Sequence, residues 1–268
     1  MNRHYLVIGC SRGLGLELSK YLLKNNDFVY GVARTKPEIL GEFNNFSFIG
    51  QDLMAESSIQ IIFNWIIKLN IKIDGVVFNA GIYGPIGKLE LTSASEWMSC
   101  IKLNLISASE CLRETIKLFH KQGFGNFVAL SGGGATKPMA RATAYAASKA
   151  GLVRLVESVA NDQKSTNFTF NCVAPGLMKT DLLKNILETD QNAVGEDFYN
   201  KMLEFANSDI DSKNEAIKLI GKLLELKNGR PTGKLISAVW DNWDELIENK
   251  EYQENLEVHT LRRVELEN

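Results

Sequence analysis

The chain has 268 residues, of which 45% are hydrophobic and 23% charged, and this composition excludes a disordered or fibrous protein. The formal net charge of −2 excludes the strongly basic surface typical of proteins that bind nucleic acid or an anionic membrane. The four cysteines and three histidines are scattered without metal-binding spacing, so we expect no metal site and a cytoplasmic protein with reduced thiols. We also expect neither a signal peptide nor a membrane span, because every apolar run is too short.

The hydrophobic pattern predicts strands and helices that alternate along the chain. Seven short apolar runs are typical of buried strands, at residues 5–8, 28–32, 46–49, 74–78, 127–130, 168–173 and 235–239. Helical spacing of apolar residues predicts helices over roughly 14–22, 59–67, 95–119 and 143–161. Strands separated by helices of this length form right-handed βαβ units. We therefore expect an α/β protein with a doubly wound parallel β-sheet, the Rossmann fold, covered by helices on both faces.

Residues 182–228 interrupt this alternation between the last two predicted strands. Their pattern is mostly helical and rich in charge, and they follow a strand at the sheet edge where α/β proteins bind ligands. We therefore expect a helical lid over a substrate, although the segment offers no motif that names the substrate. We expect residues 1–239 to form a single domain, and residues 240–268 a tail packed on that domain or on a neighbouring subunit.

A glycine-rich turn, Gly-Cys-Ser-Arg-Gly-Leu-Gly at residues 9–15, follows the first predicted strand. Glycines allow backbone N–H groups to approach a pyrophosphate, which then lies at the N-terminus of the next helix. The spacing is G-x3-G-x-G rather than G-x-G-x-x-G, and glycines after a strand can also serve only as turn residues. The place of this turn within a first βα unit favours a dinucleotide site, with cofactor contacts from Gly9, Ser11, Arg12, Gly13, Leu14 and Gly15.

The end of the second predicted strand indicates which dinucleotide is bound. Sites that prefer NAD usually place Asp or Glu there, about 20 residues past the turn, to accept a hydrogen bond from the ribose 2′-hydroxyl. This chain has Ala33-Arg34-Thr35 at that point and no acid. Arg34, together with Arg12 from the turn, offers forked donors to a 2′-phosphate, although both could also be solvated surface arginines. The sequence therefore favours NADP(H).

Tyr145 and Lys149 lie four residues apart in a predicted helix, and hence on one face of it. A free phenol has a pKa near 10, and a nearby cation lowers that pKa, which suits a tyrosine to general acid–base work. A Y-x3-K pair is also common on helix surfaces. Upstream, Ser131 lies at the C-terminal end of the fifth predicted strand, where α/β sheets bind ligands.

Taken together, these motifs resemble the short-chain dehydrogenase/reductase family. The resemblance extends over roughly residues 3–181 and then weakens, because Ser-Ala-Val-Trp-Asp at residues 237–241 stands where relatives usually have a glycine pair. The matching features follow the family's order: the glycine turn, Asn79-Ala80-Gly81, Asn104, Ser131, Tyr145-x3-Lys149 and Pro175-Gly176.

The resemblance implies an NADP(H)-dependent oxidoreductase that interconverts a carbonyl and a secondary alcohol by hydride transfer. Tyr145 would then be the general acid/base, and Lys149 would hold the nicotinamide ribose and lower the pKa of Tyr145. Ser131 would donate a hydrogen bond to the substrate oxygen, and Asn104 would hold a water that connects Lys149 to solvent. Further cofactor contacts are implied for Asp52, Leu53, Asn79, Ala80, Gly81, Tyr145, Lys149, Pro175, Gly176 and Thr180.

The serine of this set departs from the family's usual spacing. Ser131 lies 14 residues before Tyr145, one more than is most common, so an ungapped comparison puts Gly132 in the serine's place. Either the glycines let the backbone fold back so that Ser131 still points at the substrate oxygen, or Thr136 or a backbone N–H polarises the carbonyl instead. We expect the first arrangement.

Two further expectations concern the ligand and the assembly. The substrate is expected to be a small metabolite, either a 3-oxoacyl or a sugar-derived compound. The alternative is a non-catalytic NADP(H)-sensing or scaffold protein on the same fold, against which the intact Tyr145, Lys149 and Asn104 argue. The resemblance also implies a homo-oligomer, a tetramer or a dimer, formed through the exposed sides of the helices after Ser95 and Thr143. We expect neither a nucleic-acid nor a membrane partner.

Overall fold

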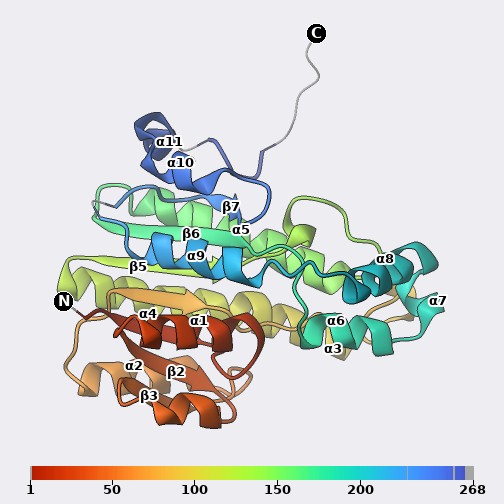
Figure 1. The fold of residues 1–268 in the computed structure, drawn as a ribbon, viewed down its shortest axis with the longest axis horizontal. Helices are drawn as coiled ribbons and strands as arrows, with labels where there is room; N and C mark the ends of the chain where they lie inside the picture. Colours follow the sequence, from red (N-terminus) through yellow and green to blue (C-terminus); the bar gives the residue numbers. More distant parts are fainter. Residues whose placement is uncertain (1, 228, 256, 263–268) are drawn as a thin grey trace.

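The computed structural model describes residues 2–227, 229–255 and 257–262, and these residues form one seven-stranded parallel sheet (Figure 1). The order across the sheet is β3-β2-β1-β4-β5-β6-β7, so the chain starts in the middle and winds outward in both directions. This order confirms the predicted doubly wound fold in a single domain. The strands are β1 (His4–Ile8), β2 (Phe28–Ala33), β3 (Phe46–Gly50), β4 (Gly75–Phe78), β5 (Gly125–Leu130), β6 (Phe168–Ala174) and β7 (Leu235–Ser237).

Alternating side chains on the central strands build a separate core on each face of the sheet. In β1, Leu6 and Ile8 point to one face, and Tyr5 and Val7 to the other. The first face is covered by α2 (Ser58–Lys68), α4 (Ser107–Gln122) and α5 (Thr143–Asp162). The second face is covered by α1 (Gly13–Lys24), α9 (Lys213–Leu224) and α10 (Trp243–Glu248). Burial on both faces explains why the strands are continuous apolar runs.

The helix predicted over residues 95–119 is interrupted by a π-helical turn. It consists of α3 (Ala94–Ile101), the turn η3 (Lys102–Ile106) and then α4. A π turn inserts an extra residue into the helix and is frequent at functional sites. Asn104 lies in this turn and is buried. The remaining short segments are η1 (Glu38–Glu42), η2 (Leu89–Leu91), η4 (Gly133–Ala135) and α11 (Lys250–Glu254).

The predicted lid is shorter than residues 182–228. Only α6 (Asp181–Glu188), α7 (Gln191–Val194) and α8 (Glu196–Asn207) project at one end of the molecule, beyond the tips of the strand arrows (Figure 1). Helix α9 instead packs on the sheet, because its residues Ala216, Leu219 and Ile220 are fully buried in the second core. Including α9 in the lid was therefore wrong, and Asn228, its predicted end, lies outside the described residues.

The described part of the tail packs on the domain. The backbone N of Leu235 in β7 donates to the carbonyl of His259 at 2.8 Å, and Lys234 Nζ donates to the carbonyl of Val258 at 2.9 Å. The backbone N of Leu261 donates to the Glu157 carboxylate on α5 at 2.6 Å. These contacts hold the tail against β7 and α5, while residues 263–268 lie outside the described residues. Within the described residues, no helix combines the length and the apolar character needed to cross a membrane.

Candidate active site

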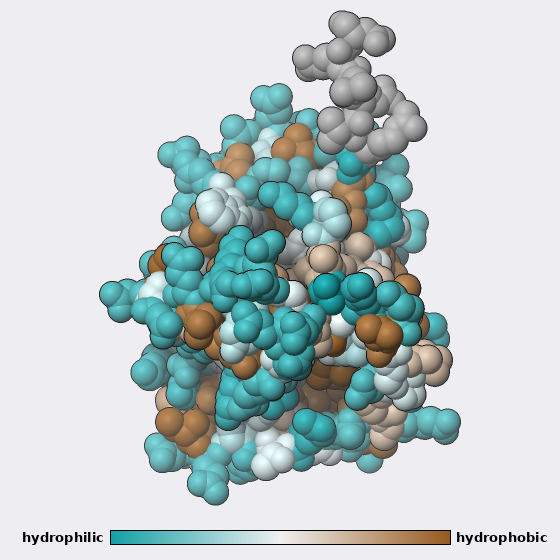
Figure 2. All heavy atoms as spheres, turned by 90° about the vertical axis from the view of Figure 1, so that its right-hand side faces the viewer, coloured by the Kyte–Doolittle hydropathy of each residue, from teal (hydrophilic) through white to brown (hydrophobic). Residues whose placement is uncertain are grey.

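Two adjoining pockets lie where the strands end, at the edge where parallel sheets bind ligands. The larger, which we call the cofactor groove, has about 350 Å³ and runs along the turn after β1, the ends of β2 and β4, and the start of α6. The smaller, the reaction pocket, has about 220 Å³ and lies between the ends of β5 and β6, α5 and the lid helices α6 and α8. Figure 2 looks onto this end of the molecule, where hydrophilic side chains surround a hollow with apolar residues inside.

The turn after β1 is built around glycines that leave no space for side chains. Gly9 has a φ of +92°, and a Cβ there would lie 2.8 Å from the backbone N of Ala80. A Cβ on Gly15 would overlap the carbonyl oxygen of Gly9. Asn79 Nδ2 donates to that same oxygen at 2.8 Å and so ties the turn to the end of β4. These glycines let the turn pack closely against the end of β4 at the N-terminus of α1, an arrangement that fits a bound pyrophosphate.

Both arginines that we predicted to face a 2′-phosphate line the cofactor groove. Arg34 is exposed at the end of β2. Arg12 Nη1 donates to Asp181 Oδ2 at 3.0 Å, and both side chains are more than half exposed. Because Asp181 is the first residue of α6, this ion pair connects the glycine turn to the lid.

The other predicted cofactor residues are also brought together at this edge, with one exception. Gly15 packs behind the turn and lines neither pocket. Pro175 and Gly176 line the reaction pocket. The cofactor groove is lined by Gly9, Ser11, Gly13, Leu14, Asp52, Leu53, Asn79, Ala80, Gly81 and Thr180.

Asn104 fixes the chain that follows β4. Its Oδ1 accepts from the backbone N of Ile82 at 2.9 Å, and its Nδ2 donates to the carbonyl of Ile82 at 2.9 Å and to Ser148 Oγ at 3.0 Å. Ser148 in turn donates to the carbonyl of Tyr145 at 2.7 Å. The π turn therefore places the Asn104 amide where it connects the loop after β4 to α5. A hydrogen-bonded asparagine at a fully buried position satisfies the polar groups around it.

Tyr145 and Lys149 come from successive turns of α5 and both line the reaction pocket. Lys149 Nζ donates to the carbonyl of Leu130 at 2.7 Å and lies 5.7 Å from the centre of the Tyr145 ring. Burial lowers the pKa of Lys149 to about 8 and raises the pKa of Tyr145 to about 12, because it disfavours the charged form of each group. In the protein alone, the pKa of Tyr145 thus moves opposite to the predicted direction, because burial disfavours the phenolate.

Ser131 and Gly132 follow β5 at the reaction pocket. The Ser131 Oγ is buried and has no hydrogen-bond partner among the described residues, so it is available to a ligand oxygen. A Cβ on Gly132 would overlap the hydroxyl of Tyr145, so the phenol occupies the space that a side chain at this position would need. Thr136 is exposed and does not line the pocket, so the structure brings Ser131, and not Thr136, next to Tyr145.

Seven further residues that line the reaction pocket were missed in the sequence. We call them the apolar wall, and they pack with Tyr145 into a third hydrophobic cluster: Tyr83, Met139, Leu183, Ile186, Phe198, Met202 and Phe205. Among the described residues that line this pocket, Lys149 is the only charged one. The i, i+4, i+7 spacing of the three residues from α8 was a signal for this wall, but the many charges on the opposite face of the helix obscured it.

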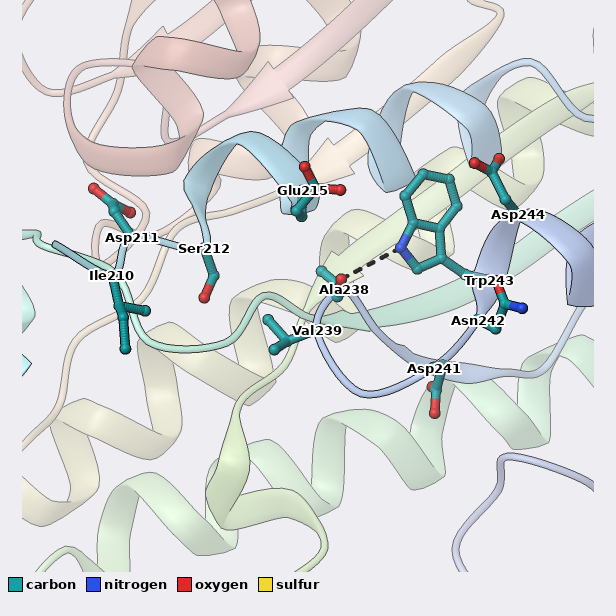
Figure 3. A pocket seen from close by; sticks show the side chains of 10 residues that line it. All are labelled: Ile210, Asp211, Ser212, Glu215, Ala238, Val239, Asp241, Asn242, Trp243 and Asp244. Carbon is teal, nitrogen blue, oxygen red and sulfur yellow. Dashed lines mark hydrogen bonds between the residues drawn. The ribbon is translucent and has the colours of Figure 1, made fainter.

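A separate hollow of about 480 Å³ lies between the start of α9 and the chain after β7 (Figure 3). Trp243 forms one side of it and donates from Nε1 to the carbonyl of Ala238 at 3.3 Å. Two of its acidic side chains have close neighbours, since Asp211 pairs with Lys213 at 3.1 Å and Asp241 Oδ2 lies 3.6 Å from His259 Nδ1. The hollow contains none of the residues predicted for catalysis.

Comparison with known proteins agrees with this geometry. The family model for short chain dehydrogenases matches residues 3–191. A benzil reductase ((S)-benzoin forming) of Saccharomyces cerevisiae is 30% identical over 201 residues, which cover 70% of this chain and 76% of that protein. A short-chain dehydrogenase/reductase of Penicillium canescens is 30% identical over 183 residues, which cover 68% of this chain and 71% of its own.

Solved structures show the same fold. A short-chain dehydrogenase/reductase from Saccharomyces cerevisiae superposes with a TM-score of 0.79 at 26% identity, covering 90% of this chain and 97% of its own. The protein ElxO, solved with NADP bound, superposes with a TM-score of 0.74 at 22% identity, covering 89% of this chain and 97% of its own. With the family match over most of the chain and the glycine turn, Tyr145 and Lys149 gathered at one edge of the sheet, this chain belongs to the short-chain dehydrogenase/reductase family of oxidoreductases.

Proposed function

We propose that this protein is an NADP(H)-dependent oxidoreductase that interconverts a carbonyl and a secondary alcohol, with Tyr145 as the general acid/base. One observation carries the proposal. The phenol of Tyr145 and the unpartnered hydroxyl of Ser131 line a single apolar pocket, and that pocket adjoins the groove along the glycine turn. A proton donor and a second hydroxyl beside a dinucleotide groove are the groups that reduction of a carbonyl requires.

NADP(H), when bound, supplies or accepts the hydride. The glycine turn at the N-terminus of α1 is suited to the pyrophosphate, and Arg34 and Arg12 to the 2′-phosphate. Asp52 would contact the adenine, and Thr180 the carboxamide of the nicotinamide. The absence of an acid at the end of β2 supports NADP(H) over NAD(H), and the fold shared with NADP-bound ElxO agrees with it.

In the reduction direction, the substrate carbonyl lies between Tyr145 and Ser131. Tyr145 donates its proton to the carbonyl oxygen, while the Ser131 hydroxyl donates a hydrogen bond to the charge that develops there. The raised pKa of Tyr145, about 12, keeps the phenol protonated at neutral pH, which is the form needed for reduction. Lys149 would hold the nicotinamide ribose, and its ammonium group stabilises the phenolate that remains after the proton has left.

The apolar wall favours an uncharged carbonyl compound with apolar substituents. A sugar-derived substrate would bury several hydroxyl groups against Leu183, Ile186, Phe198, Met202 and Phe205, and unpaired polar groups are costly. The yeast relative is named for the reduction of benzil, an aromatic diketone, which supports the same class. A 3-oxoacyl compound with an apolar chain also fits this description, whereas a polyol does not.

The test is to follow NADPH and NADH oxidation with a panel of aromatic and aliphatic ketones, 3-oxoacyl thioesters and sugars. We expect turnover with NADPH and the apolar ketones, and little with NADH or the sugars. Binding of NADPH without turnover of any compound would favour the alternative, a non-catalytic NADP(H)-sensing protein. Turnover of sugars alone would contradict the assignment of the apolar wall to the substrate.

Three further features stay predictions. We propose that α6, α7 and α8 act as a mobile lid that orders over the bound substrate. We also propose a homo-oligomer, a tetramer or a dimer, formed through the exposed sides of α4 and α5. A cytoplasmic location is likewise a prediction.

A further inference from the structure

Tyr83 lies in the loop after β4 and lines the reaction pocket. Two hydrogen bonds with the Asn104 amide fix the backbone of Ile82. On the other side, Cys100 Sγ lies 3.6 Å from the carbonyl of Ile82 and 3.7 Å from that of Tyr83. Gly84 has a φ of +76°, and a Cβ there would lie 2.8 Å from Cys100. The backbone on both sides of Tyr83 is therefore closely packed against α3 and the π turn.

From this loop the Tyr83 ring lies flat against the Tyr145 ring. The ring centres are 4.5 Å apart, and the planes differ by 11°. Tyr83 is 8% exposed, and its hydroxyl donates to Met139 Sδ at 3.5 Å. Aromatic rings at this separation attract each other and bury a large area, so Tyr83 restricts the ring of Tyr145 on one face.

A second constraint on Tyr145 comes from the backbone at Gly132, where an added Cβ would overlap the phenol oxygen. Gly132 has no hydroxyl that could hold that oxygen by a hydrogen bond. Lys149 Nζ donates to the carbonyl of Leu130 and lies 5.7 Å from the centre of the Tyr145 ring, and among the described residues no direct hydrogen bond joins it to the phenol. Of the described side chains, the stacked Tyr83 is the one whose ring contact fixes the plane of the Tyr145 ring.

We propose that Tyr83 is a positioning residue for this reaction, whose ring holds the Tyr145 phenol in the orientation needed for proton transfer and keeps water off its face. The proposal rests on the proposed function, because it presumes that Tyr145 transfers the proton. It goes beyond that function in assigning orientation of the acid to an aromatic stack rather than to a hydrogen bond. A small misorientation of a reacting group is sufficient to slow a reaction strongly.

The stack also affects the protonation of Tyr145. The titratable groups that face it are Lys149 from its own helix, Tyr83 from the loop after β4 and Cys100 from α3. Burial dominates and raises the pKa of Tyr145. Loss of the Tyr83 ring admits water to the phenol and lowers its pKa. The protonated form needed for reduction is then lost at a lower pH than in the unaltered enzyme.

The experiment compares Tyr83→Leu with Tyr83→Phe in the NADPH-loaded enzyme, using a saturating apolar ketone found in the panel. We expect Tyr83→Leu to lower kcat about tenfold and to shift the alkaline limb of the kcat profile to lower pH. Tyr83→Phe keeps the ring and loses only the hydroxyl, so kcat and the alkaline limb stay close to those of the unaltered enzyme. The NADPH Kd of both variants should be unchanged, because Tyr83 does not line the cofactor groove.

The matched control is Phe198→Leu, which removes another aromatic ring of the apolar wall that is not stacked on Tyr145. It should raise KM for the ketone without shifting the alkaline limb. Tyr83→Met is used if Tyr83→Leu does not bind NADPH. The proposal is overturned if neither kcat nor the alkaline limb changes on loss of the ring, or if Tyr83→Phe loses as much as Tyr83→Leu. Tyr145→Phe is measured in parallel, and its retention of activity would instead refute the proposed function.

Discussion

The cofactor groove and the reaction pocket lie side by side at one edge of the sheet, but they are built from different parts of the chain. The groove is lined mainly by residues that directly follow β1, β2, β3 and β4, and it contains four charged side chains, Arg12, Arg34, Asp52 and Asp181. The reaction pocket is formed by buried side chains from a loop, α5 and two lid helices that are distant in sequence. We therefore expect substitutions in the groove to change cofactor binding, and substitutions in the pocket to change kcat or the KM for the substrate.

Apart from Tyr145, the largest effect in this comparison is expected at Ser131. Ser131→Ala removes a hydroxyl that is buried without a partner in the reaction pocket, and should lower kcat by about 10²-fold, the usual loss for one preorganised donor to a developing oxyanion. Steady-state rates with saturating NADPH and ketone measure it. Thr136→Ala is the matched control, because Thr136 is exposed and lies outside the pocket. A rate that falls for Thr136→Ala and not for Ser131→Ala would reverse the assignment.

A smaller effect, on binding rather than on rate, is expected at Arg34. Arg34→Asp should weaken NADPH binding by about 1–3 kcal/mol, because it removes charge-assisted hydrogen bonds and adds repulsion. Fluorescence titration with NADPH and NADH measures the change, which should be much smaller for NADH. Lys36→Asp makes the same change of charge two residues away and outside the groove, so it should have little effect. Equal affinity of the unaltered protein for both cofactors would contradict the preference.

The smallest effect concerns the ion pair that connects the groove to the lid. If Arg12 binds the 2′-phosphate as proposed, Asp181 competes for it, so Asp181→Asn should strengthen NADPH binding. Both side chains are more than half exposed, which limits the gain to less than about 1 kcal/mol. Glu188→Gln breaks a similarly exposed pair with Lys184 on the same helix and should leave the Kd unchanged. Weaker binding of NADPH to the Asp181→Asn protein would show instead that the Arg12–Asp181 ion pair supports cofactor binding.

The cofactor groove and the reaction pocket also differ in how much of each could be predicted from the sequence. The sheet, the glycine turn and the place of Arg34 at the end of β2 depend on short local patterns, and the structure confirms these placements. The π turn at Asn104 could not be predicted, because it arises from hydrogen bonds to Ile82 in another element. Tyr83 carried no signal, since its stacking depends on how the loop meets α5.

The lid prediction shows that a high content of charged residues does not identify a lid helix. The sequence pattern of residues 182–228 predicts mostly helices rich in charge. In the structure, one face of α9 is fully buried and covers the sheet. Helices α6 and α8 instead turn their apolar sides to the reaction pocket. Periodicity reveals that each helix has an apolar face but not which surface it meets. The direction of the Tyr145 pKa was missed for a similar reason, because the extent of burial follows from the packed structure and not from the Y-x3-K spacing.

The most direct test of the account is a single-turnover measurement on the NADPH-loaded enzyme and its Tyr145→Phe variant. Each is mixed with an apolar aromatic ketone, and loss of NADPH absorbance is followed after equal NADPH binding has been established by titration. We expect rapid oxidation of NADPH by the unaltered enzyme and almost none by the Tyr145→Phe variant, since only the proton transfer is lost. If the variant retains more than a few per cent of the rate, Tyr145 is not the acid and the central claim is wrong.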